Sequence, residues 1–271
     1  MSDIPPLPDH ASGIQCSAAD GIDRTNTDFM RGKIQKLIQQ PDFNESGFQL
    51  VAGAYSIPWM ASTHSNIEVL DRKGEMFASL DTQQIDRKTG EIKEYFPDGE
   101  RAAPVQDDCM KGNSVVLDDN RRDRQILATG TGPKVLLAFA KSTERARLNA
   151  DRDMDYHAVS FGRSGGVNSN GLARDHARPH GIDLKGTFDK HSVLGAPGIG
   201  TDISAGHKGR TSFYEGVSPD QFMKDPRYLE HLYNDLQEIH PIRQQERAIE
   251  AGKRQTSAQI SLEGSPNFQP A

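Results

Sequence analysis

Three consecutive segments with strand-like alternation constrain the fold of this chain more than any other feature. They are GFQLVAGAYSIP (47–58), THSNIEVLD (63–71) and EMFASLD (75–81). The second segment alternates strictly, which is typical of a strand with one apolar and one polar face. Its apolar face carries Ser65, Ile67 and Val69, and its polar face carries His64, Asn66 and Glu68. The three segments therefore predict an antiparallel meander with a tight turn at Arg72–Gly74.

The register of this meander decides which residue faces His64. If Arg72 and Lys73 form a two-residue turn, Asp81 lies directly opposite His64, close enough to orient its imidazole. The alternative is a three-residue loop with a bulge at Gly74, which moves Asp81 to the other face. The hydrophobic pattern favours the first register and the turn chemistry favours the second. We adopt the first, which predicts a His64–Asp81 pair.

The remaining chain alternates between helical and strand-like segments, so we expect an α+β fold. Helical signals occur at 25–40, 142–153, 169–178 and from Pro226 onward, whereas 132–141 has the composition of a buried strand. Ser218-Pro219 and Asp225-Pro226 each place a capping residue before a proline at the first helical position. The predicted organisation is an irregular N-terminal arm (1–26), an α+β domain (27–215), a C-terminal helical segment (216–251) and a flexible tail (252–271).

Charge and composition exclude several classes of function. The net charge is −6 and no basic patch dominates, so we expect no nucleic-acid partner. No run of about 18 apolar residues is present, so we expect no membrane span and a soluble protein. The N-terminus lacks the features of a secretory signal, which predicts a cytoplasmic protein or one exported by a signal-peptide-independent system. Two cysteines, Cys16 and Cys109, argue against a disulfide scaffold or a thiolate zinc site.

The segment GRSGGVNSNGLARDHA (162–177) places a serine between two amides where a glycine-rich loop becomes a helix. Ser169 is then either an ordinary N-cap or a nucleophile at the positive end of the helix. In the second interpretation, Gly166 lets backbone N–H groups approach a ligand, and Asn168 or Asn170 donates to an oxyanion. His176, two turns further on, is expected to line the same cleft.

The meander followed far downstream by GVNSNGLARDHARPHGI resembles the circularly permuted papain-like superfamily, which includes NlpC-type cell-wall amidases and lecithin–retinol acyltransferase-like enzymes. The resemblance covers roughly residues 48–205, and bacterial relatives carry the same N-S-N turn. It implies that His64 is the general base, Asp81 its orienting partner and Ser169 the nucleophile. Ser169 stands where the family normally has cysteine, so the site is either a serine variant or one that has lost catalysis.

Other chemistry-bearing residues fit less well. Cys16 precedes His64 as in the unpermuted family order, but no apolar helix follows it, and Cys109 has acidic neighbours that raise a thiol pKa. His176 and His180 have the spacing of a helical metal pair, yet Pro179 interrupts the helix, so we expect no metal site. The glycine-rich segments GRSGG and GAPGIG match no known phosphate-binding fingerprint.

The sequence therefore predicts a permuted papain-like (NlpC-type) hydrolase that needs no cofactor. It would cleave an amide bond in a peptide or peptidoglycan stem through Ser169, His64 and Asp81, with acyl transfer to a lipid or an amine as a variant of the same chemistry. Asn168, Asn170, Gly166 and His176 would complete the site. The alternative is a catalytically inactive papain-like fold that binds a peptide or protein.

Overall fold

The computed structural model of the chain describes residues 28–57, 62–74, 76–93, 101–107, 123–157, 167–185, 203, 207 and 209–263. At the facing ends of the first two strands, residues 55–57 and 62–64, only the backbone is described. Several expectations fall outside these residues. They concern the N-terminal arm (1–26), Cys16, Cys109, Gly166 and the two glycine-rich loops.

The described strands form one antiparallel sheet in the order β4-β3-β2-β1-β6, with β5 also paired to β3. Ser79 and Leu80 of β3 pair with β2 and β5, whereas Gln84 and Ile85 pair with β4 and β5. Strands β2 and β4 therefore share one edge of β3, and β5 occupies the other. The strands are β1 (Ser46–Ile57), β2 (Ser62–Leu70), β3 (Met76–Ile85), β4 (Ile92–Lys93), β5 (Arg101–Asp107) and β6 (Asp123–Thr131).

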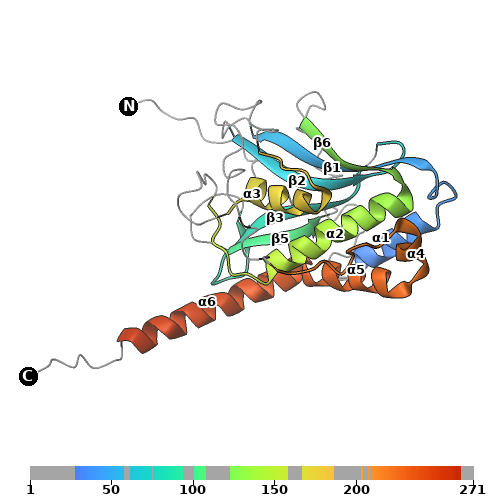
Figure 1. The fold of residues 1–271 in the computed structure, drawn as a ribbon. Helices are drawn as coiled ribbons and strands as arrows, with labels where there is room; N and C mark the ends of the chain where they lie inside the picture. Colours follow the sequence, from blue (N-terminus) through green and yellow to red (C-terminus); the bar gives the residue numbers. More distant parts are fainter. Residues whose placement is uncertain are drawn as a thin grey trace, which may run out of the picture.

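Helices α2 and α3 lie across one face of this sheet, and helices α1, α4 and α5 gather beside α2 (Figure 1). Helix α6 extends away from the rest of the molecule. The helices are α1 (Phe29–Ile38), α2 (Gly132–Ala150), α3 (Ser169–Ala177), the 3-10 turn η6 (Arg178–His180), α4 (Pro219–Lys224), α5 (Pro226–Glu238) and α6 (Pro241–Glu263). The α+β prediction with an antiparallel sheet packed on helices is confirmed at this level.

The main core lies between the sheet and these helices. Ile67 and Val69 of β2 pack in one apolar cluster with Phe139 of α2 and Ala173 of α3. The apolar face predicted for the second strand is therefore the face that the helices cover. Burial of this kind is the dominant favourable contribution to folding.

The meander forms as predicted, but its register combines the two alternatives. Gly74 has a φ of 77° and donates its N–H to the Asp71 carbonyl at 3.0 Å, as in a three-residue loop. A further irregularity follows, because Leu70 pairs with Met76 whereas Val69 pairs with Ala78. The turn shifts the register by one residue, and the bulge at Phe77 shifts it by one more.

Two shifts return Asp81 to the polar face but not to the position opposite His64. Ile67 pairs with Leu80, so the next position along, Asn66, aligns with Asp81. The predicted His64–Asp81 pair is therefore wrong. Gly74 forms the three-residue loop that the turn residues favour, and the apolar residues of the two strands still share one face. Both are possible because the bulge adds a second one-residue shift.

The predicted strand at 132–141 is also wrong, because these residues form the first half of α2. Every side chain from Val135 to Ala140 is buried, so the segment has no polar face and no helical period. Periodicity cannot distinguish a fully buried helix from a buried strand. The helix then continues through the segment predicted as a separate short helix and ends at Ala150.

The capping signals at Ser218 and Asp225 correctly predicted where two helices begin. Ser218 caps α4 with a reciprocal capping box to Gln221, and Asp225 caps α5. The apolar stripe of α5 faces the core through Leu232 and Leu236. The α6 helix, in contrast, runs to Glu263 and so enters the segment expected to be a flexible tail.

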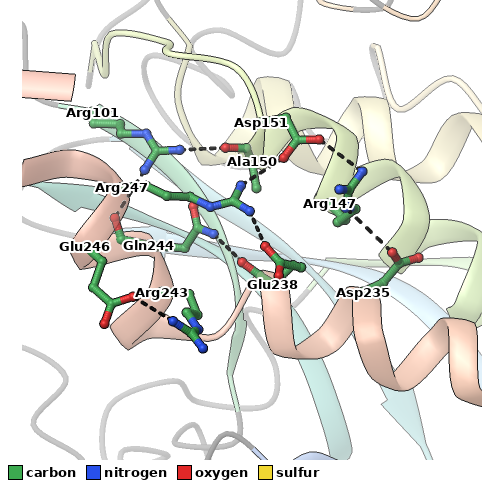
Figure 2. A network of polar contacts seen from close by, with 10 residues as sticks. All are labelled: Arg101, Arg147, Ala150, Asp151, Asp235, Glu238, Arg243, Gln244, Glu246 and Arg247. Atoms are coloured by element: carbon green, nitrogen blue, oxygen red, sulfur yellow. Dashed lines mark hydrogen bonds and ion pairs between the residues drawn. The ribbon is translucent and has the colours of Figure 1, made fainter. Parts of the chain in front are cut away.

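Arg101 of β5 joins three elements at the base of α6 (Figure 2). Its guanidinium donates to the carbonyl of Ala150 at 2.6 Å, at the end of α2, and to that of Gln244 at 3.1 Å, in α6. Burial lowers the pKa of this group to about 10, and it stays charged at neutral pH. Arg247 of α6 adds ion pairs to Asp151 and Glu238. The first half of α6 is therefore an integral part of the fold.

Candidate functional site

The first turn of α3 carries the predicted nucleophile. Asn168, not Ser169, is the N-cap, and its Oδ1 accepts the Gly171 N–H at 3.2 Å. Ser169 is the first residue within the helix and is only 3% exposed. The interpretation of Ser169 as the cap is therefore wrong by one residue. Sequence analysis assigned the amide N–H groups of Asn168 to an oxyanion site, whereas the carbonyl oxygen of the same side chain accepts the bond of an ordinary cap.

This first turn meets β2 through Ser65. The Ser65 hydroxyl donates to Asn170 Oδ1 at 2.7 Å, and both residues are 1% exposed. Successive residues of a strand alternate between its two faces, so strand position 64 belongs to the face of Asn66 and Glu68. The side chain of His64 itself lies outside the described part. The structure thus brings α3 to the strand that carries His64, and Ser65 makes the contact.

The sheet face away from α2 and α3 holds a buried polar layer. It contains Asn66 and Glu68 of β2 and Ser79 and Asp81 of β3, all at most 4% exposed. Gly53 of β1 makes room for this layer, because a Cβ there would lie 2.9 Å from Asn66 Oδ1. Asp81 Oδ1 accepts the N–H of Thr82 at 2.6 Å. The polar face of β2 is therefore buried, not solvated, at these positions.

A second polar cluster, which sequence analysis missed, joins α2 to α3. Asp175 accepts two hydrogen bonds from Arg145, from Nε at 2.8 Å and from Nη2 at 3.0 Å, and a third from Asn149 at 2.9 Å. His207 Nε2 lies 2.8 Å from Asn149 Oδ1. These hydrogen bonds from Arg145 and Asn149 hold the pKa of Asp175 below its usual value despite burial. The only local signal was a carboxylate within a helix, which does not reveal a partner 30 residues away.

His176 does not line a cleft with Ser169. It is buried at the α2–α3 interface, and burial lowers its pKa to about 4, so it is neutral at pH 7. The Ser142 hydroxyl donates to the His176 carbonyl at 2.9 Å and lies 2.9 Å from His180 Nε2. Within the described residues, no three side chains of histidine, cysteine, aspartate or glutamate cluster as metal ligands would.

A cavity of about 560 Å³ opens on the outer side of α2, facing η6 and the loop before α4. Four of its lining residues are cationic: Lys141, Arg145, Arg178 and Arg210. Two are acidic, and of these Glu144 accepts hydrogen bonds from the Ser212 hydroxyl at 2.5 Å and the Phe213 N–H at 2.8 Å. The remaining lining residues are Leu148, Pro179, Thr211, Ser212 and Glu215. The arrangement suits an anion.

Comparison with known proteins identifies no relative. No protein-family model matches the sequence, and neither a curated protein nor a solved structure matches the chain. Among the helices of the described residues, none is long and apolar enough to cross a membrane.

Proposed function

We propose that this protein is a binding module on an α+β scaffold of papain-like type, without acyl-transfer chemistry at Ser169. The observation that carries the proposal is the Ser65–Asn170 hydrogen bond of 2.7 Å. Two buried side chains without a titratable group make this contact between α3 and β2. A hydrolase with Ser169 as nucleophile would need its general base near this contact.

Two further features support the absence of catalysis. Asp81 aligns with Asn66, so it does not lie directly opposite strand position 64 as the proposed triad required. Ser169 is almost fully buried at the start of α3, whereas a nucleophile must reach a substrate carbonyl. A serine hydroxyl also depends on an adjacent base more strongly than a cysteine thiol does.

A serine hydrolase or acyltransferase remains the second candidate, acting on a peptide or a peptidoglycan stem. The observation in its favour is the position of Ser169 as the first residue of α3, where the helix dipole favours a developing negative charge. This turn is docked on the strand that carries His64.

One experiment separates the two candidates. The full-length protein is incubated with a fluorophosphonate probe, and the labelled peptide is identified by mass spectrometry, alongside Ser169→Ala and His64→Ala. Peptidoglycan fragments and peptides are digested in parallel. We expect no adduct at Ser169 and no cleavage by the unmodified protein. An adduct at Ser169 that disappears in His64→Ala would establish the hydrolase instead.

The binding role is assigned to the cavity beside α2, because its wall combines fixed charges with enough volume for a small ligand. Another cavity, of about 480 Å³ between α1 and α5, has Arg31 as the one cation among its lining residues. Arg31 is already paired with Glu230 at 2.9 Å. The first cavity therefore offers the more specific recognition.

A further inference from the structure

The cavity beside α2 concentrates positive charge on a protein whose overall charge is −6. Lys141 and Arg145 project from α2, Arg178 from η6, and Arg210 from the loop before α4. Three separate segments thus contribute cationic side chains to the same cavity. The cavity lining therefore holds four cations and two carboxylates, Glu144 and Glu215, which leaves an excess of positive charge on its wall.

The guanidinium of Arg145 is held in place by the buried carboxylate of Asp175. Asp175 is 2% exposed and binds the Nε and Nη2 edge of the guanidinium, while Arg145 itself retains 19% exposure. An arginine has five N–H donors in a rigid fork, so this pair leaves the Nη1 donors for another partner. A guanidinium fixed in this way loses little conformational entropy when it binds a ligand.

The acidic wall residues Glu144 and Glu215 offset part of this charge, but the four cations outnumber them. The two oxygens of Glu144 are engaged by Ser212 and Phe213, in the loop that carries Arg210. The bonds from Ser212 and Phe213 to Glu144 therefore hold this part of the loop against α2. Burial is the largest cause that lowers the pKa of nearby His180 to about 4, and the positive charge of Lys141 lowers it further. The second cause accords with a positive potential around this cavity.

We propose that this cavity binds a small phosphate-bearing ligand, with Arg145 as a fixed fork and Lys141, Arg178 and Arg210 surrounding the phosphate oxygens. This inference deepens the binding role proposed above and rests on it. Three arginines favour phosphate over a single carboxylate, because a phosphate carries more negative charge and offers more acceptor oxygens to several guanidinium groups. Leu148 and Pro179 offer an apolar wall to the organic part of the ligand.

The test is isothermal titration calorimetry on the full-length protein with inorganic pyrophosphate, a phosphoserine peptide and citrate. Pyrophosphate represents a free phosphate ligand, the peptide represents a phosphorylated protein, and citrate is a carboxylate of similar charge. We expect pyrophosphate or the phosphopeptide to bind at least tenfold more tightly than citrate, and more weakly as salt rises. Citrate binding as tightly as both phosphates, or no binding of any probe, would overturn the inference.

Variants locate the site. Arg210→Ala and Lys141→Ala, whose side chains lie on the cavity wall, should each weaken phosphate binding about tenfold or more. Arg243→Ala, which removes an exposed arginine of α6 outside the cavity, is the matched control and should leave the affinity unchanged. Equal affinity in all three variants would refute the assigned site.

The Asp175→Asn variant distinguishes the positioning of Arg145 from simple electrostatic attraction of the ligand. It makes the cavity more positive, so simple attraction predicts tighter binding, whereas loss of the fixed Arg145 fork predicts weaker binding. We expect weaker binding, and tighter binding would refute the positioning role of Asp175. These measurements are independent of probe labelling at Ser169, so failure of the phosphate site and failure of the non-catalytic assignment remain distinguishable.

Discussion

Ser65 of β2 and Asn170 of α3 share a hydrogen bond of 2.7 Å between two fully buried side chains that lie 105 residues apart in the sequence. This bond fixes the start of α3, which carries the predicted nucleophile Ser169, on the sheet through a structural contact. Because both partners are buried, loss of either one leaves the other without its hydrogen bond.

Ser65→Ala and Asn170→Ala should each lower the free energy of unfolding by about 1–3 kcal/mol, the cost of leaving one buried polar group unsatisfied. Urea denaturation monitored by circular dichroism measures the change. Ser257→Ala removes an exposed hydroxyl on α6 and should change stability by no more than about 0.5 kcal/mol. Equal effects of the buried and exposed substitutions would contradict the contact.

Gly252→Ala tests the docking of α6 on the β3–β4 turn. A Cβ at this position would lie 2.2 Å from the Arg87 carbonyl oxygen, so the helix or the turn must move. We expect a loss of about 1–3 kcal/mol of stability, as for other overpacked sites. Gly32→Ala in α1 is the matched control, because a Cβ there meets nothing within 4 Å, and it should stabilise by about 0.5–1 kcal/mol. Similar thermal midpoints for the two variants would argue against a packed α6.

Asp235 of α5 should make the protein less stable as pH rises from about 4 to 7. Burial is the largest cause that raises its pKa from 3.8 to about 7, and Arg147 only partly opposes this shift. The charged groups that act on it are Arg147, Glu144, Asp151 and Glu238, and His231 lies 3.5 Å away. Asp235 and Arg147 are seen in Figure 2.

The folded protein retains the Asp235 proton over this interval while the unfolded chain releases it, so the destabilisation grows with pH and is complete above about 7. Asp235→Asn removes this cost. Its thermal midpoint should exceed that of the unmodified protein by more at pH 8 than at pH 4. A difference that stays constant with pH would be inconsistent with a raised pKa.

His176 should have the opposite effect to Asp235 on the pH dependence of stability. Burial lowers its pKa from 6.5 to about 4, so its stabilising contribution is present above pH 6.5 and is lost as the pH falls toward 4. The same sign applies to His180 and His207. His176→Gln should therefore flatten the loss of stability between pH 6.5 and 4, by up to about 1.4 kcal/mol for each pH unit.

Urea denaturation at several pH values measures this slope. Asp235 and the histidines titrate over overlapping ranges with opposite signs, so the informative quantity is each variant minus the unmodified protein. A parallel offset between His176→Gln and the unmodified protein at every pH would show that His176 does not titrate there.

The sequence by itself determined the parts of the fold that depend on neighbouring residues. Alternation in β2 specified its apolar face, Gly74 specified the turn, and Ser218 and Asp225 specified where α4 and α5 begin. Each of these signals is complete within a few residues, because strand period, positive φ and helix capping are local properties.

Tertiary structure decided the rest. The bulge at Phe77 placed Asp81 opposite Asn66, and the sheet and neighbouring helices buried the segment of α2 that resembled a strand. The Asp175–Arg145 pair arises only where α3 packs on α2, and the basic cavity only where α2, η6 and a later loop meet. Contacts between residues far apart in the chain depend on packing energies that no local pattern contains.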